Sequence, residues 1–102
     1  MHFLVTITPT HEAANALDGG PQGPAPLFAW IADRYKPLAF WVDAGRRSAS
    51  WIVDVADAGR LHELVHVAAR KAGTAPELTP IIMGDEAAAT IPAAIQVAAT
   101  AP

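Results

Sequence analysis

The segment HELVH, residues 62–66, holds the clearest metal-binding pattern in the sequence. Histidines four positions apart lie on the same side of a helix, about 6 Å apart along its axis. In zinc hydrolases such a pair binds the ion while the glutamate polarises a zinc-bound water. A third ligand is also required, and the carboxylates that follow are Glu77, Asp85 and Glu86, in or beyond a predicted strand. The pattern therefore favours two partly exposed helix histidines over a zinc hydrolase, and we expect no bound metal.

Three tryptophans and a tyrosine form a second group of interest. These rings are numerous for a chain of 102 residues, and they suit the walls of a flat pocket for an apolar cyclic or aromatic ligand. The predicted walls are Trp30, Tyr35, Trp41 and Trp51. The same rings would also serve in core and dimer packing, because aromatic side chains dominate burial energies. The sequence leaves both interpretations open.

Acid and base candidates come from the surroundings of these rings and from the histidines. Asp43 shares a strand face with Trp41, where a carboxylate suits general acid or base catalysis. His11 begins an unusual connection and His62 belongs to HELVH; imidazole is the side chain best suited to proton transfer near neutral pH. Arg46, in a turn, is the candidate contact for an anion or oxyanion. Each of these residues also fits the role of a solvated surface group.

The elements that must position these residues follow from hydrophobic periodicity. Strands are predicted over residues 2–8, 38–44, 48–55 and 77–83, and helices over residues 25–36 and 57–72. Pro26 fits the first turn of the first helix. Asp54 or Asp57 is placed to cap the second helix and Gly73 to end it, and Pro80 places the last strand at a sheet edge. This order predicts a ferredoxin-like α+β domain over residues 1–84, with an antiparallel sheet and both helices on one face.

This arrangement gives no place in the core to two segments and to one face of the sheet. Residues 10–24 are rich in proline and glycine, so they form either a lid over a pocket or a mobile excursion. Residues 85–102 have too few large apolar groups for a core of their own, and we expect them to dock on a neighbouring subunit or to fray. The second face of the sheet, which includes Leu4 and Thr6, is apolar enough to predict a homodimer or a larger homo-oligomer.

The hairpin and the second predicted helix also allow a family comparison. The residues Trp41, Ala44-Gly45, Asp54-Val55 and Leu61-His62 lie in one ungapped register, together with Phe3, Val5 and Thr8. This register, over about half the chain, resembles that of the muconolactone isomerase family. The resemblance implies a dimeric α+β barrel and a proton transfer on a small lactone without metal or cofactor. It also implies large rings in which terminal segments are exchanged. The proline- and glycine-rich stretch 19–26 departs from the charged, helix-forming segment of those isomerases.

Net charge and the length of the apolar runs narrow the range of possible functions. The formal charge of −3 gives no electrostatic footprint for nucleic acid or for an anionic membrane. No apolar run approaches the roughly 20 residues of a membrane span, and the start lacks the basic flank of a signal peptide, so we expect a cytoplasmic protein. The leading hypothesis is a cofactor-independent isomerase or cyclase for a small cyclic, aromatic or polyketide-like substrate. The alternative is a non-catalytic ligand-binding or assembly module, and an HExxH zinc hydrolase ranks third.

Overall fold

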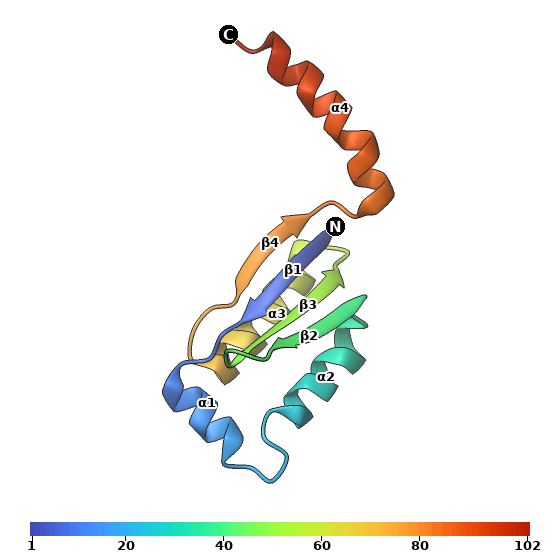
Figure 1. Cartoon of the computed structure of the whole chain (residues 1–102). Coiled ribbons are helices and arrows are strands. Elements are labelled where there is room, and N and C mark those ends of the chain that lie inside the picture. The colour runs from blue at the N-terminus through green and yellow to red at the C-terminus, as the bar shows by residue number, and fades with distance from the viewer.

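The computed structural model describes residues 1–102 and contains one four-stranded antiparallel sheet (Figure 1). Its strands are β1 (His2–Ile7), β2 (Ala39–Asp43), β3 (Ser48–Asp54) and β4 (Glu77–Ile81), in the spatial order β2-β3-β1-β4. The helices are α1 (His11–Asp18), α2 (Ala25–Tyr35), α3 (Ala58–Ala72) and α4 (Gly84–Thr100). An α+β fold with an antiparallel sheet is confirmed, and the strand order is compatible with the predicted ferredoxin-like arrangement. Pro80 lies in β4, which is an edge strand as expected.

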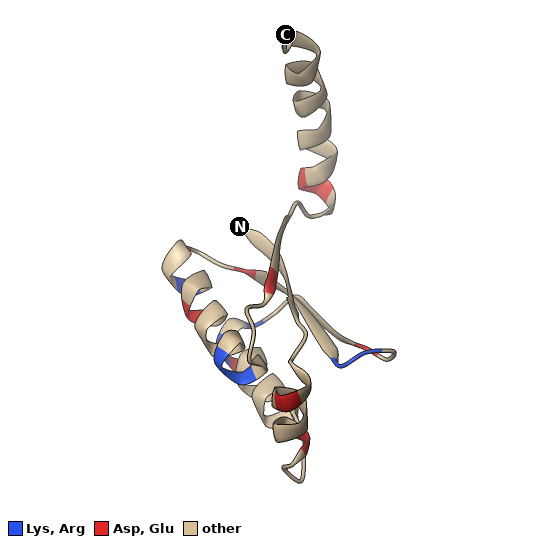
Figure 2. Ribbon diagram, turned by 90° about the vertical axis from the view of Figure 1, so that its left-hand side faces the viewer, with Lys and Arg blue, Asp and Glu red and all other residues tan.

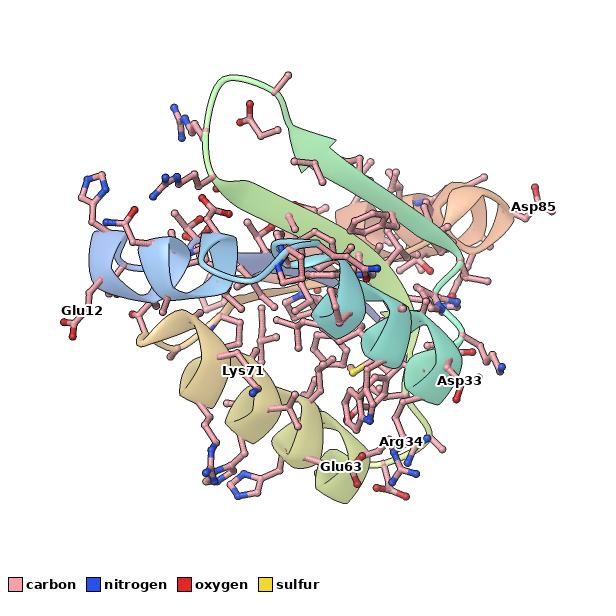
Figure 3. All side chains as sticks on the ribbon, turned by 90° about the horizontal axis from the view of Figure 1, so that it is seen from below. Glu12, Asp33, Arg34, Glu63, Lys71 and Asp85 are labelled. Atoms are coloured by element: carbon pink, nitrogen blue, oxygen red, sulfur yellow. The ribbon has the colours of Figure 1, made fainter.

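The core lies between one face of the sheet and the helices α2 and α3. Alternate residues of β1, namely Phe3, Val5 and Ile7, are buried, as the period of two requires. They pack in one cluster with Ile31 of α2 and Leu64 of α3. Both helices lie on this face of the sheet (Figures 1 and 3). The opposite face has no helix over it.

The ends of α2 and α3 follow the local signals in the sequence. Asp57 caps α3 by accepting a hydrogen bond from the Arg60 amide at 2.8 Å. Asp54, the other candidate cap, instead binds the N-terminal amine at 3.0 Å. Gly73 ends α3 with φ of 72°, a left-handed conformation that glycine adopts without steric cost.

The connection predicted as a lid or a mobile excursion contains a helix. Thr10 caps α1 by accepting a hydrogen bond from the Ala13 amide at 3.2 Å, and its own amide donates to the Ala72 carbonyl at 2.9 Å. The proline and glycine residues are concentrated after Asp18, so residues 11–18 remain free to form helical hydrogen bonds. The irregular part is therefore only the short stretch between α1 and α2.

The C-terminal segment, which was predicted only as a docking or fraying tail, forms α4. This helix has no buried residue, and Figures 1 and 2 show it extending away from the rest of the chain. It gives the molecule an elongated shape of 56 × 26 × 25 Å. Ile91, Ile95 and Val97 are all more than half exposed. None of the four helices is long and apolar enough to cross a membrane.

We expect Gly73→Ala to lower the free energy of unfolding by about 1–2 kcal/mol, because a side chain is strained in the left-handed region. The added Cβ would also lie 2.9 Å from Thr10 Oγ1. Gly84→Ala is the matched control, since its Cβ would meet no atom within 4 Å, and we expect a change below about 0.5 kcal/mol. Urea unfolding measures both, and equal stabilities of the two variants would contradict the strain at Gly73.

Candidate functional site

An apolar cavity of about 220 Å³ lies at the end of the sheet where β1 and β2 finish and β3 begins. It is bounded by α1, by the start of α2 and by the last residue of α3. Its apolar walls are Ile7, Pro9, Ala14, Leu17, Pro24, Leu27, Phe28, Val42, Ala49 and Ala72. The polar lining consists of Asp18, Arg46, Arg47 and Ser48. Such a cavity, with few polar groups in an apolar wall, is the usual form of a small-molecule site.

The two arginines at the cavity differ in their partners. Arg47 forms an ion pair with Asp18 at 3.1 Å and donates a hydrogen bond to the Asn15 side chain at 2.9 Å. Arg46 is 79% exposed, and its only ion-pair partner is Asp43, at 4.0 Å. Arg47 therefore attaches α1 to the hairpin, whereas the guanidinium of Arg46 is available for an anionic ligand.

Helix α1 covers the cavity and is anchored at both of its ends. At its start Thr10 bonds to the end of α3, and near its end Asn15 and Asp18 bond to Arg47. Ala14 and Leu17, on one side of α1, face the cavity. Residues 10–24 thus supply part of the wall, and whether they open and close as a lid stays a prediction.

Among the predicted site residues, Arg46 lines this cavity and the four aromatic residues do not. Trp51 is 2% exposed and packs against the cavity residue Phe28, with ring centroids 5.6 Å apart. Trp30 and Tyr35 lie together further along α2, with centroids 6.2 Å apart. Trp30 lines a more open depression between α2 and α3.

Trp41 lies on the opposite face of the sheet from Trp51. In the register of the hairpin Phe40 pairs with Trp51, and Trp41 pairs with Ser50, and directly paired residues share a face. The expected pocket with all four rings as its walls is therefore not formed within one chain. Phe28, which was not among the predicted walls, is the ring that lines the cavity.

The predicted acid and base groups lie outside the cavity lining. Asp43 accepts a hydrogen bond from the Gly45 amide at 2.9 Å, so it stabilises the turn. His11 is exposed in the first turn of α1, and His62 is exposed on α3. The carboxylate at the cavity is Asp18, which was not among the predicted acid or base groups. Recognising it required placing a helix before Gly19, because only a helix brings Asp18 to the same side as Ala14.

The glutamate of HELVH is occupied by an ion pair between α2 and α3. Glu63 accepts hydrogen bonds from Arg34 Nε at 2.9 Å, Arg34 Nη2 at 3.1 Å and the Tyr35 hydroxyl at 2.8 Å. Figure 3 shows Arg34 and Glu63 next to each other at the ends of α2 and α3. The bonds from Arg34, followed by the bond from Tyr35, lower the pKa of Glu63 to about 2. Burial, followed by the bond to Glu63, raises the pKa of Tyr35 to about 12.

This arrangement does not provide the machinery of a zinc hydrolase. A carboxylate held between an arginine and a tyrosine is not directed at a water on the histidines. No group of three or more His, Cys, Asp or Glu side chains is placed to hold a metal ion. HELVH therefore contributes a helix-to-helix ion pair and, separately, two exposed histidines.

Comparisons with models of protein families, with curated proteins and with solved structures found no match.

The Glu63 ion pair makes the free energy of unfolding depend on pH in the acid range. The folded-state pKa of about 2 lies below the ordinary 4.5, so ionised Glu63 stabilises the fold above about pH 4.5, and this contribution is lost as the pH falls through about 2. We expect Glu63→Gln to lower the melting temperature at about pH 7 and to weaken its dependence on acid. Circular dichroism melts test this, with Glu77→Gln, an exposed carboxylate without an ion pair, as the control. Similar acid curves for both variants would refute it.

Proposed function

We propose that the cavity under α1 binds a small apolar, cyclic or aromatic molecule with an anionic group, and that the protein transfers a proton within this ligand without a cofactor. The observation that supports this proposal is the combination of apolar walls with the exposed guanidinium of Arg46 at one side. An apolar wall favours a hydrophobic ring, and arginine is suited to recognising a carboxylate.

Asp18 is the group we assign to proton transfer. Its carboxylate lines the cavity and lies 3.1 Å from Arg47, so a ligand in the cavity would meet both an acceptor of protons and a cation. An arginine beside a carboxylate can stabilise the negative charge that develops on a ligand oxygen when a neighbouring carbon loses a proton. The resemblance to the muconolactone isomerase family supports the same class of reaction, an isomerisation or cyclisation. In this proposal Asp18 takes the place of Asp43, His11 and His62.

The second candidate function is non-catalytic binding of the same class of ligand. It is favoured by the same ion pair, because the bond from Arg47 gives the Asp18 carboxylate a structural role in attaching α1. It is also favoured by the exposed positions of His11 and His62. The two functions differ in whether the bound ligand reacts.

We expect small cyclic and aromatic carboxylates to bind and their uncharged amides to bind more weakly, because only the carboxylate pairs with Arg46. Arg46→Gln should weaken carboxylate binding about fivefold, the size expected for a solvent-exposed ion pair, and leave amide binding unchanged. Arg70→Gln is the matched control, since it removes the same charge from α3 at the other depression. Calorimetric titration with paired acids and amides provides the measurement. Equal affinities for acids and amides would contradict the proposed site.

The proton transfer is tested with the same ligands in D₂O. A general base contributes about 10²- to 10⁴-fold to a rate, so Asp18→Asn should lower deuterium incorporation by at least about 100-fold while ligands still bind. Asp33→Asn, an exposed carboxylate on α2, should leave the rate unchanged. Ligands that bind without any deuterium incorporation would favour the non-catalytic function, and binding of no ligand would reject both.

We further propose that two chains pack through the open faces of their sheets, as in a ferredoxin-like dimeric α+β barrel. The register places Leu4 opposite Ile52, and Ile52 opposite Ala39, on the face without helices. Trp41 lies on the same face and is 44% exposed. An apolar face of this kind is stabilised when a second sheet covers it. The exposed apolar residues of α4 would supply additional contact with a neighbouring chain.

We expect light scattering to give at least twice the 10.7 kDa mass of one chain at micromolar concentration. Trp41→Asp should produce monomers, because a carboxylate would be buried without a partner in the interface. Trp30→Asp is the matched control: Trp30 is 46% exposed but lies on α2, so this variant should keep the mass of the unaltered protein. A mass of one chain for the unaltered protein would disprove the dimer.

A further inference from the structure

His62 and His66 form a pair on α3 that neither the cavity nor the core uses. Their Nε2 atoms are 3.0 Å apart, and the ring centroids are 4.5 Å apart with an interplanar angle of 67°. Both side chains are exposed, and neither forms a hydrogen bond to any other residue. Without a metal, the N–H of one ring donates to the bare nitrogen of the other. The two Nε2 atoms are therefore already adjacent.

The 3.0 Å between the two nitrogens is the length of an N–H···N hydrogen bond, and it is also close to the separation of neighbouring ligands of a metal ion. With metal–nitrogen bonds of about 2.0–2.1 Å, atoms 3.0 Å apart subtend an angle of roughly 90–97° at the metal. A tetrahedral angle with the same bonds would require a separation of about 3.4 Å. Right angles between ligands are typical of tetragonal Cu²⁺ and Ni²⁺, which imidazole also suits.

The helix holds the pair in place before any ion binds. Positions i and i+4 are neighbours on a helix surface, and α3 has 15 residues with a cap at each end. Glu63, between the histidines in sequence, is directed at Arg34 and Tyr35 on α2. It therefore does not compete for the imidazoles, and water would occupy the remaining positions of a bound ion.

We propose that His62 and His66 bind one divalent transition-metal ion of the Cu²⁺ or Ni²⁺ type through their two Nε2 atoms. Both rings then carry their proton on Nδ1, and the hydrogen bond between the rings is replaced by two bonds to the metal. This site differs from an HExxH zinc centre in two respects: it has two protein ligands, and its glutamate takes no part. It is also independent of the proposed ligand cavity, because neither histidine lines that cavity.

The experiment uses the full chain without an affinity tag, titrated with CuCl₂ and with NiCl₂ in a buffer that does not bind metals. We expect one ion per chain, and a melting temperature that rises by about 4 °C or more at saturation, because the ion binds the folded helix better than the unfolded chain. The electron paramagnetic resonance spectrum of the Cu²⁺ complex should show two equatorial nitrogen ligands. A spectrum with one nitrogen ligand or none would overturn the proposal, even if copper bound elsewhere on the chain.

Single variants separate this pair from His11, another exposed histidine. His62→Ala and His66→Ala should each weaken Cu²⁺ binding by at least about tenfold. Removing a residue that only hydrogen-bonds to a metal ligand already lowers affinity by about 10- to 100-fold, so removing a ligand itself should lower it by no less. Both positions are exposed on a helix, and alanine favours helix, so the fold should be kept, which circular dichroism checks. His11→Ala, at an exposed histidine on α1, should leave the affinity unchanged. Equal affinities for His62→Ala, His11→Ala and the unaltered chain would also overturn the proposal.

Discussion

Burial of Trp51 on the central pair of strands is the interaction on which the rest of the fold depends. Trp51 pairs with Val5 of β1 on one side and with Phe40 of β2 on the other, and Phe28 of α2 packs against its ring. Trp51 therefore joins β3 to β1, β2 and α2. Since a large aromatic ring contributes several kcal/mol when it is buried, these contacts fix both the position of α2 and the register of the hairpin. Phe28, in turn, forms a wall of the candidate cavity.

The cavity is a consequence of how α1 is attached. Thr10 binds the end of α3 and Arg47 binds the end of α1, so the helix bridges the edge of the core without filling it. Small and medium side chains, including Ala14 and Ala72, leave the space under it. A void lined by apolar groups is costly when empty, which is a physical reason for a ligand to occupy it. Arg47 is used in holding α1, and this leaves Arg46 as the cation for the proposed ligand.

The two faces of the sheet have different roles. One is covered by α2 and α3, whose relative position is set in part by the bonds from Arg34 and Tyr35 to Glu63. The other bears Leu4, Ile52 and Trp41 without a covering helix. Helix α4, which buries no residue, adds the exposed apolar side chains Ile91, Ile95 and Val97 to those of this face. The proposed dimer would cover these apolar side chains.

Local sequence signals determined the four strands and the helices α2 and α3. Alternation marked the four strands, Asp57 and Gly73 bounded α3, and Pro80 placed β4 at the edge, because each of these effects acts over a few residues. The grouping of side chains was different. Alternation shows which residues of one strand share a face, but only the register of the hairpin shows that Trp41 and Trp51 lie on opposite faces, since a slip of one residue reverses every side chain.

The chemistry of the site depends on contacts between distant segments in the same way. Glu63 reads as a catalytic residue within HELVH, and only the position of α2 reveals that its partners are Arg34 and Tyr35. Asp18 has no motif around it, and it becomes a candidate only when Arg47 and the cavity are placed beside it. Sequence spacing determined the His62 and His66 pair, because one helix contains both residues. Every other functional grouping joins separate elements, so the tertiary structure decided it.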